Sequence, residues 1–146
     1  MTGISTYDKD FFAWANEQAA LLRSGRLAEA DIEHIAEEIE SMGKTEKREL
    51  ISRLTVLLLH LLKWRYQPAL RGASWRATIK VRRRDIVRHL EDNPSLRAKI
   101  AQAMADAYGD AIILAAAETG FAEASFPAAS PWPFEQAIDA DFWPEN

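Results

Sequence analysis

Apolar residues recur at helical spacing over residues 32–61, and this repeat constrains the fold more than any other feature of the chain. Each residue of an α-helix turns by roughly 100°, so the members of the repeat project from one side of a helix. No alternating run of β-branched residues bounded by a hairpin turn accompanies it. The pattern predicts an all-α fold, a bundle of about five helices with an irregular C-terminal segment. The stripe consists of Ile32, Ile35, Ile39, Leu50, Leu54, Leu57 and Leu61.

Gly43 lies between the two halves of this stripe, within the polar stretch 40–49. One helix over residues 27–67 would be roughly 60 Å long, whereas a compact chain of this size is roughly 35–40 Å across. Glycine in a helix costs about 1 kcal/mol relative to alanine, and Thr45 is a suitable N-cap. We therefore expect a break or sharp kink near Gly43. The alternative is a continuous helix whose polar stretch projects from the bundle.

Capping residues mark the other expected helices. The first runs over residues 8–24, between Asp8 as N-cap and Gly25, and the apolar stretch 50–64 is expected at the centre of the bundle before Pro68 ends its helix. Two more helices are expected, over residues 75–92 after Ser74 and over residues 95–119 before Gly120.

Residues 121–146 differ from the rest because they hold four of the six prolines and six aromatic residues. A short helix over 134–140 is expected, and the remainder cannot be regular. We interpret this segment as a strap packed on the bundle, with a docking segment for another protein as the alternative. Residues 1–6 are expected to be a flexible N-terminus, so that one helical domain spans residues 1–146.

Composition excludes several functional classes. The 146 residues include no cysteine, which excludes disulfide scaffolds, thiolate metal sites and cysteine nucleophiles. No glycine-rich phosphate loop or nucleophile elbow is present, so the sequence assigns no catalytic residue, cofactor or metal. The N-terminus lacks the pattern of a secretory signal, and the longest apolar run is far shorter than the ~20 residues of a membrane span. We expect a cytoplasmic protein that binds no membrane.

Charge is segregated along the chain. Residues 1–50 hold 11 acidic and 6 basic residues, residues 51–88 hold 10 basic and 1 acidic, and residues 89–146 hold 10 acidic and 2 basic. The basic middle indicates either internal pairing with the acidic ends or a surface for nucleic acid. Because the chain has a net charge of −4, we favour internal pairing and argue against nucleic acid. The candidate basic surface is Arg76, Lys80, Arg84 and Arg88.

Several charged or polar residues fall on or beside apolar stripes. An unpaired buried charge is very costly, so Arg82 and Arg83 need carboxylate partners, and a buried His60 needs a hydrogen-bond partner. A continuous helix would separate Glu38 from His60 by about 33 Å, so a shared site requires a fold-back at Gly43. We predict a partly buried polar network that is either structural or lines a ligand pocket. It comprises Glu37, Glu38, His60, Lys63, Arg82, Arg83 and Glu118.

An acidic cluster over residues 31–40 includes His34 and Glu38, whose i,i+4 spacing could hold a divalent metal. The alternative function is a metal-dependent nucleotide hydrolase that uses this cluster. Such an enzyme needs a second acidic pair, and the only plausible candidates are Asp106 and Asp110. The same cluster is also typical of a solvated helix face near the start of a helix, because acidic side chains there complement the helix dipole. We favour the solvated face.

A series of short motifs, none specific alone, resembles the bacterial family named domain of unknown function 29. The resemblance covers about residues 7–145 and implies an all-helical domain with no assigned activity or catalytic residues. The polar stretch around Gly43, the aromatic C-terminus and the lack of a catalytic motif in the sequence favour a non-enzymatic interaction module or small accessory protein, either a homodimer or bound to an unknown protein partner. The motifs are Tyr7–Phe11 with Trp14, Leu22-Arg23, Asp31 with Glu37–Glu40, Met42-Gly43, His60–Trp64 with Gln67-Pro68, Ser74-Trp75, Pro94–Leu96, Glu118–Gly120, Phe126-Pro127, and Phe142 with Pro144.

Overall fold

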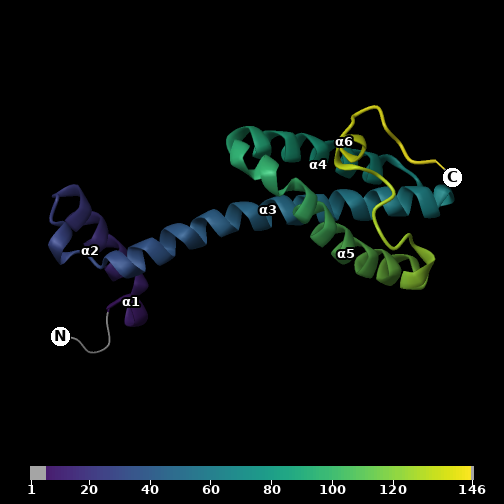
Figure 1. Ribbon diagram of the computed structural model, residues 1–146. Coiled ribbons are helices and arrows are strands. Elements are labelled where there is room, and N and C mark those ends of the chain that lie inside the picture. The colour runs from purple at the N-terminus through teal and green to yellow at the C-terminus, as the bar shows by residue number, and fades with distance from the viewer. Residues whose placement is uncertain (1–5, 146) are drawn as a thin grey trace. The chain divides into compact units, whose positions relative to one another are not determined.

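The computed structural model describes residues 6–145, and within that range it contains helices and no strand (Figure 1). The all-α prediction is confirmed. Four helices are long, and the expected flexible segment 1–6 lies, except for Thr6, outside the described residues. The helices are α1 (Thr6–Lys9), α2 (Phe11–Arg23), α3 (Ile32–Tyr66), α4 (Ala73–Asp92), α5 (Ile100–Thr119) and α6 (Phe134–Ala137). Short 3₁₀ helices lie at Leu27–Glu29, Pro68–Leu70, Pro94–Lys99 and Glu123–Ser125.

α3 is continuous through Gly43, so the expected break there is wrong, and two predicted helices are one. The residues around Gly43 are mostly Glu, Lys and Arg, which favour helix and offset a penalty of about 1 kcal/mol. Thr45 does not cap a new helix, because its hydroxyl donates to the Ser41 carbonyl oxygen at 3.1 Å, one turn back in the same helix. Further along α3, Arg53 pairs with Glu49 at 3.1 Å, which supports the helix across its polar stretch.

The expected capping residues were partly right. Asp10 rather than Asp8 caps α2, since its carboxylate accepts from the Ala13 amide at 3.1 Å. α4 begins at Ala73, one residue before the expected Ser74 cap, and Gly72 provides no side-chain cap. Gly25 and Gly120 adopt φ of 76° and 81°, the left-handed conformation that glycine tolerates at a helix end.

The chain forms two compact units, residues 1–45 and residues 46–146. In the N-terminal unit, α1, α2 and the beginning of α3 bury two side chains among the described residues, Trp14 and Gln18. The hydrophobic core lies in the C-terminal unit. The expectation of a single domain over residues 1–146 stays a prediction.

The core of the C-terminal unit forms around the second half of α3. Leu57, Leu58 and Leu61 have no exposed surface, and each fully buried leucine contributes about 1.5–3 kcal/mol. α4 and α5 pack against this half of α3 (Figure 1). α5 presents the small side chains of Ala103, Ala107, Ala111 and Ala115, all fully buried, which lets the helices approach closely.

The C-terminal segment beyond Gly120 packs on this core through Phe126, Trp132 and Phe134, all buried. The Tyr108 hydroxyl of α5 donates to the Pro127 carbonyl oxygen at 2.6 Å, and burial raises the pKa of Tyr108 to about 12. Proline and aromatic side chains here form a packed layer over the helices. No helix in the described part of the chain is long and apolar enough to cross a membrane.

Candidate functional site: a basic and aromatic cleft

A cleft of about 470 Å³ opens where the end of α3, the start of α4 and the end of the C-terminal segment meet. Its walls combine two indole rings, three cations and one carboxylate. Positive charge and aromatic surface therefore line the same cleft. The lining residues are Trp64, Arg71, Arg76, Lys80, Trp143 and Glu145.

The turn after α3 positions Arg71. Pro68 follows the end of α3 and starts a 3₁₀ turn that returns the chain toward the helix it has just left. The Arg71 Nε atom then donates to the Trp64 carbonyl oxygen at 2.6 Å, and its Nη2 atom lies 3.4 Å from the Pro144 carbonyl oxygen. These contacts satisfy a carbonyl at the end of α3 and hold the guanidinium group at the cleft.

Arg76 lies over two indole rings. Its guanidinium carbon is 5.1 Å from the centre of the Trp64 ring and 5.5 Å from that of the Trp143 ring. The two rings are themselves 4.7 Å apart at an interplanar angle of 43°. Cation–π contacts of this kind orient an arginine without neutralising its charge, so Arg76 stays fully cationic at the cleft wall.

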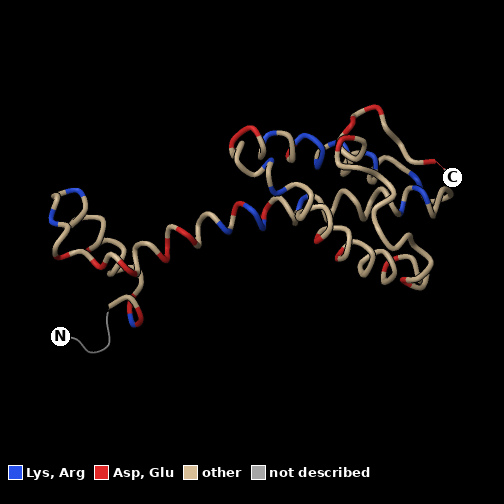
Figure 2. The backbone as a smooth tube through the Cα atoms, viewed as in Figure 1, with Lys and Arg blue, Asp and Glu red and all other residues tan. Residues whose placement is uncertain are grey.

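The candidate basic surface forms a row on α4. Arg76, Lys80, Arg84 and Arg88 are all exposed and follow one another at i,i+4 spacing. Among residues 6–145, none of the four forms an ion pair with a carboxylate. Figure 2 shows the basic residues along α4, whereas α5 carries acidic residues and no lysine or arginine.

Arg83 is buried and holds the C-terminal segment. Its Nε atom donates to the Ala137 carbonyl oxygen at 2.8 Å and its Nη2 atom to the Phe142 carbonyl oxygen at 2.7 Å, while Nη1 is buried without an acceptor. Burial lowers the pKa of Arg83, and the nearby charge of Asp139 opposes that shift. The predicted carboxylate partner is thus replaced by two main-chain carbonyls.

Four members of the predicted polar network gather beside the core. Lys63 Nζ donates to Glu118 Oε1 at 2.7 Å, and His60 Nδ1 donates to the Val56 carbonyl oxygen at 2.8 Å. Burial lowers the pKa of His60, whose ring also lies within electrostatic reach of Lys63, Glu118 and Arg82. Arg82 itself pairs with Asp85 at 3.0 Å, its neighbour on α4.

The other two members, Glu37 and Glu38, belong to the N-terminal unit and have their contacts there. The Tyr7 hydroxyl donates to Glu38 at 2.5 Å, and this hydrogen bond raises the pKa of Tyr7 to about 12. A site shared between Glu38 and His60 required the chain to fold back at Gly43. α3 is continuous there, so the fold-back is absent.

A second polar cluster surrounds His34. His34 Nδ1 lies 2.7 Å from Asp31 Oδ2, which also accepts from the Trp14 indole nitrogen at 3.1 Å, and the Tyr7 ring stacks on the imidazole with centroids 3.9 Å apart. The contact with Asp31 raises the pKa of His34, and the contact with His34 lowers the pKa of Asp31. This cluster ties α1 and α2 to the start of α3.

The residues of the proposed acidic metal site have other contacts. Asp31 is engaged by His34 and Trp14, and Asp106 accepts from Gln102 at 2.9 Å. Within residues 6–145, no group of three or more His, Asp or Glu side chains is arranged to hold a metal ion.

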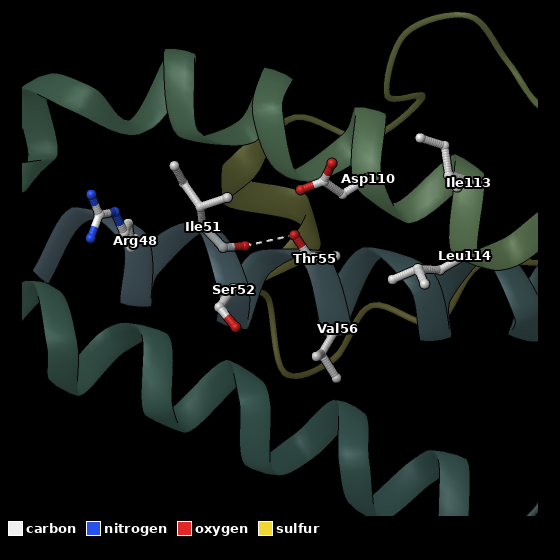
Figure 3. A pocket seen from close by; sticks show the side chains of 8 residues that line it. All are labelled: Arg48, Ile51, Ser52, Thr55, Val56, Asp110, Ile113 and Leu114. Carbon is white, nitrogen blue, oxygen red and sulfur yellow. Dashed lines mark hydrogen bonds between the residues drawn. The ribbon is translucent and has the colours of Figure 1, made fainter. Parts of the chain in front are cut away.

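A second hollow, of about 530 Å³, is an open groove between α3 and α5 in the C-terminal unit (Figure 3). Figure 3 shows Leu114 extending over α3 and the Asp110 carboxylate directed toward α3. The Thr55 hydroxyl donates a hydrogen bond to the Ile51 carbonyl oxygen at 2.7 Å. The walls of the groove are mostly apolar, and its polar side chains do not converge on one point where they could act together. The lining residues are Arg48, Ile51, Ser52, Thr55, Val56, Asp110, Ile113 and Leu114.

Sequence reasoning identified Arg76 and Lys80 but missed Arg71, Trp64 and Trp143 as parts of one cleft. Arg71 lies in a turn whose direction depends on tertiary packing. The available signal was Pro68, which ends α3 and forces a turn three residues before Arg71.

Over residues 6–145 the fold defines an all-helical protein. A family model described as Domain of unknown function DUF29 matches residues 6–143, and the chain belongs to that family. The resemblance drawn from the short motifs is therefore confirmed. No curated protein and no solved structure matches the chain.

Proposed function

We propose that this protein is a non-enzymatic helical interaction module that forms a homodimer through its N-terminal unit. The observation that carries the proposal is the apolar surface of that unit. Its described residues bury Trp14 and Gln18 and leave seven large apolar side chains exposed. Isolated units of about 40 residues usually need a disulfide, a metal or a partner to be stable. The exposed residues are Phe11, Phe12, Leu22, Leu27, Ile32, Ile39 and Met42.

The first half of α3 supplies the central part of the proposed dimer surface. Ile32, Ile35, Ile39 and Met42 follow a 3-4-3 spacing, which places apolar residues at the a and d positions of a coiled-coil seam. Ile32 is 54% exposed, Ile39 63% and Met42 66%. A helix seam of this kind is stable in water when a second helix covers it.

Charge supports a second copy of the chain as the occupant. Around this seam, residues 33–40 carry four glutamates, and residues 44–48 carry three cations and one glutamate. Two copies packed antiparallel place the acidic part of one helix beside the basic part of the other. A two-fold axis then lies near Ile39 and Met42, which gives the self-complementary interface of an isologous dimer.

Three polar side chains that could act in catalysis make structural contacts instead, which supports the non-enzymatic part of the proposal. His60 donates to Val56, Lys63 is paired with Glu118, and His34 is paired with Asp31.

Light scattering on the purified chain tests the proposal. At tens of micromolar we expect twice the monomer mass of 16.5 kDa. Ile39→Lys should give the monomer mass, because it introduces a charge at the centre of the seam. Val81→Lys is the matched control, since Val81 is 50% exposed on α4 of the other unit, and it should leave the mass of the dimer unchanged. A wild-type chain that remains a monomer throughout this range overturns the proposal.

A further inference from the structure

We infer that the cleft formed by Trp64, Arg71, Arg76, Lys80, Trp143 and Glu145 binds a small anion bearing a di- or triphosphate group. The inference is independent of dimer formation, because all six residues belong to the C-terminal unit. Its volume of about 470 Å³ lies within the range of sites for small ligands.

Uncompensated positive charge is the first argument. Arg71, Arg76 and Lys80 line one cleft, and among residues 6–145 none of them is paired with a carboxylate. Like charges at i,i+4 destabilise a helix, and the row on α4 contains three such steps in succession from Arg76 to Arg88. An anion bound in the cleft relieves the repulsion between Arg76 and Lys80, the step of the row that lines it.

Pre-organisation is the second argument. Arg71 is fixed by its bond to the Trp64 carbonyl oxygen, and Arg76 by its position over the Trp64 and Trp143 rings. A guanidinium group that is already oriented loses little entropy when it forms paired hydrogen bonds to phosphate oxygens. These two arginines therefore present donors suited to phosphate before any ligand arrives.

The backbone nearby adds to the same field. Gly72 gives α4 no side-chain cap, so the first amides of this 20-residue helix lack side-chain acceptors. The positive end of the helix dipole lies beside Arg71 and Arg76 in the sequence, and it favours an anion. The nearby Arg83 contributes a further buried positive charge.

Two observations favour a small phosphate compound over a nucleic acid. The cleft is concave and confined to three cations, and the chain carries a net charge of −4 that disfavours a long polyanion. Glu145 is the one acidic group in the cleft wall, and its carboxylate opposes any anion bound there.

Isothermal titration calorimetry of the full chain in 150 mM chloride tests the inference with inorganic pyrophosphate, ADP and adenosine. Pyrophosphate and ADP should both bind and adenosine should not. Equal affinities for the first two indicate recognition of phosphate alone, and tighter binding of ADP indicates added contacts with the nucleoside; both results support the site. Absence of heat with pyrophosphate and ADP, or binding of adenosine, overturns it.

Variants with opposite expected effects localise the site. Lys80→Gln makes no change to the indole rings and should weaken pyrophosphate binding about tenfold or more, the scale of one hydrogen bond to a charged group. Arg71→Gln should act in the same direction, whereas Glu145→Gln should strengthen binding severalfold. Arg97→Gln, an exposed cation outside the cleft, is the control. An equal loss in Arg97→Gln, or tighter binding of a single-stranded oligonucleotide than of pyrophosphate, would refute the inference.

Discussion

The two halves of α3 carry one apolar stripe into two different environments. In the second half, Leu50, Leu54 and Leu57 have no exposed surface, because α4, α5 and the C-terminal segment cover them. In the first half, Ile32 and Ile39 lie on the same side of the helix and are more than half exposed. The stripe keeps the same phase in both halves, but the second half is also apolar on its other sides. The phase alone shows which face of a helix is apolar and does not show what covers it.

The largest expected effect comes from truncating the covered half of the stripe. Leu57→Ala should lower the free energy of unfolding of the C-terminal unit by about 2–5 kcal/mol, because the cavity it leaves is closed on all sides. Ile39→Ala should change the same quantity by no more than about 0.5 kcal/mol. Hydrogen exchange of α4 and α5 amides measures both. Equal losses would show that the two halves belong to one cooperative unit.

A smaller effect is expected for the arginine that holds the C-terminal segment. Arg83→Met should destabilise this unit by about 2–3 kcal/mol, because the Ala137 and Phe142 carbonyls lose a charged donor. Limited proteolysis should then cleave within residues 121–143. The neighbouring exposed Arg84 provides the control, and Arg84→Met should leave that segment resistant. Resistance in both variants would mean that aromatic packing alone retains it.

Gly43 lies between the two halves and offers a modest stabilisation. Apart from Gly43 itself, its two chain neighbours and the backbone of the surrounding helical turns, no atom lies within 4 Å of the position that a Cβ atom would take at Gly43, and the residue is helical. Gly43→Ala should therefore strengthen the middle of α3 by about 0.5–1 kcal/mol. Slower hydrogen exchange of the amides of residues 40–48 would show this stabilisation. Faster exchange there would mean that α3 needs the flexibility of glycine at this point.

The smallest expected effect is the pH dependence of stability, which has opposite directions in the two units because of His34 and His60. Asp31 raises the pKa of His34 above 6.5, so its contribution to stability is complete below pH 6.5 and is lost as pH rises through the folded pKa. Burial lowers the pKa of His60, so stability of the other unit falls as pH drops below 6.5.

NMR titration of the two imidazoles should place the His34 midpoint above 6.5 and the His60 midpoint below it. Asp31→Asn should move the His34 midpoint down and leave His60 unchanged. Coincident midpoints in the wild-type chain would contradict this assignment.

Much of the fold could be predicted because helix positions and helix ends depend mainly on residues that are close in the sequence. Helical spacing predicted the long helices, and glycine at helix ends predicted the positive φ of Gly25 and Gly120. Continuity at Gly43 could not be predicted, since a penalty near 1 kcal/mol is comparable with the helix preference of its neighbours.

The candidate site was predictable only in part. The row of cations on α4 follows from the sequence, whereas the acceptors of Arg83 are main-chain carbonyls, which leave no mark in a sequence. The cleft also depends on how the turn after Pro68 and the position of Trp143 bring distant residues together, and this is decided by packing.

Because carbonyl oxygens accept no proton in the range where proteins remain folded, acid does not remove the two acceptors through which Arg83 holds residues 137–142. An attachment built on an aspartate or glutamate side chain weakens once its carboxylate becomes neutral. Acid should therefore not release the final segment by protonating the groups that accept hydrogen bonds from Arg83.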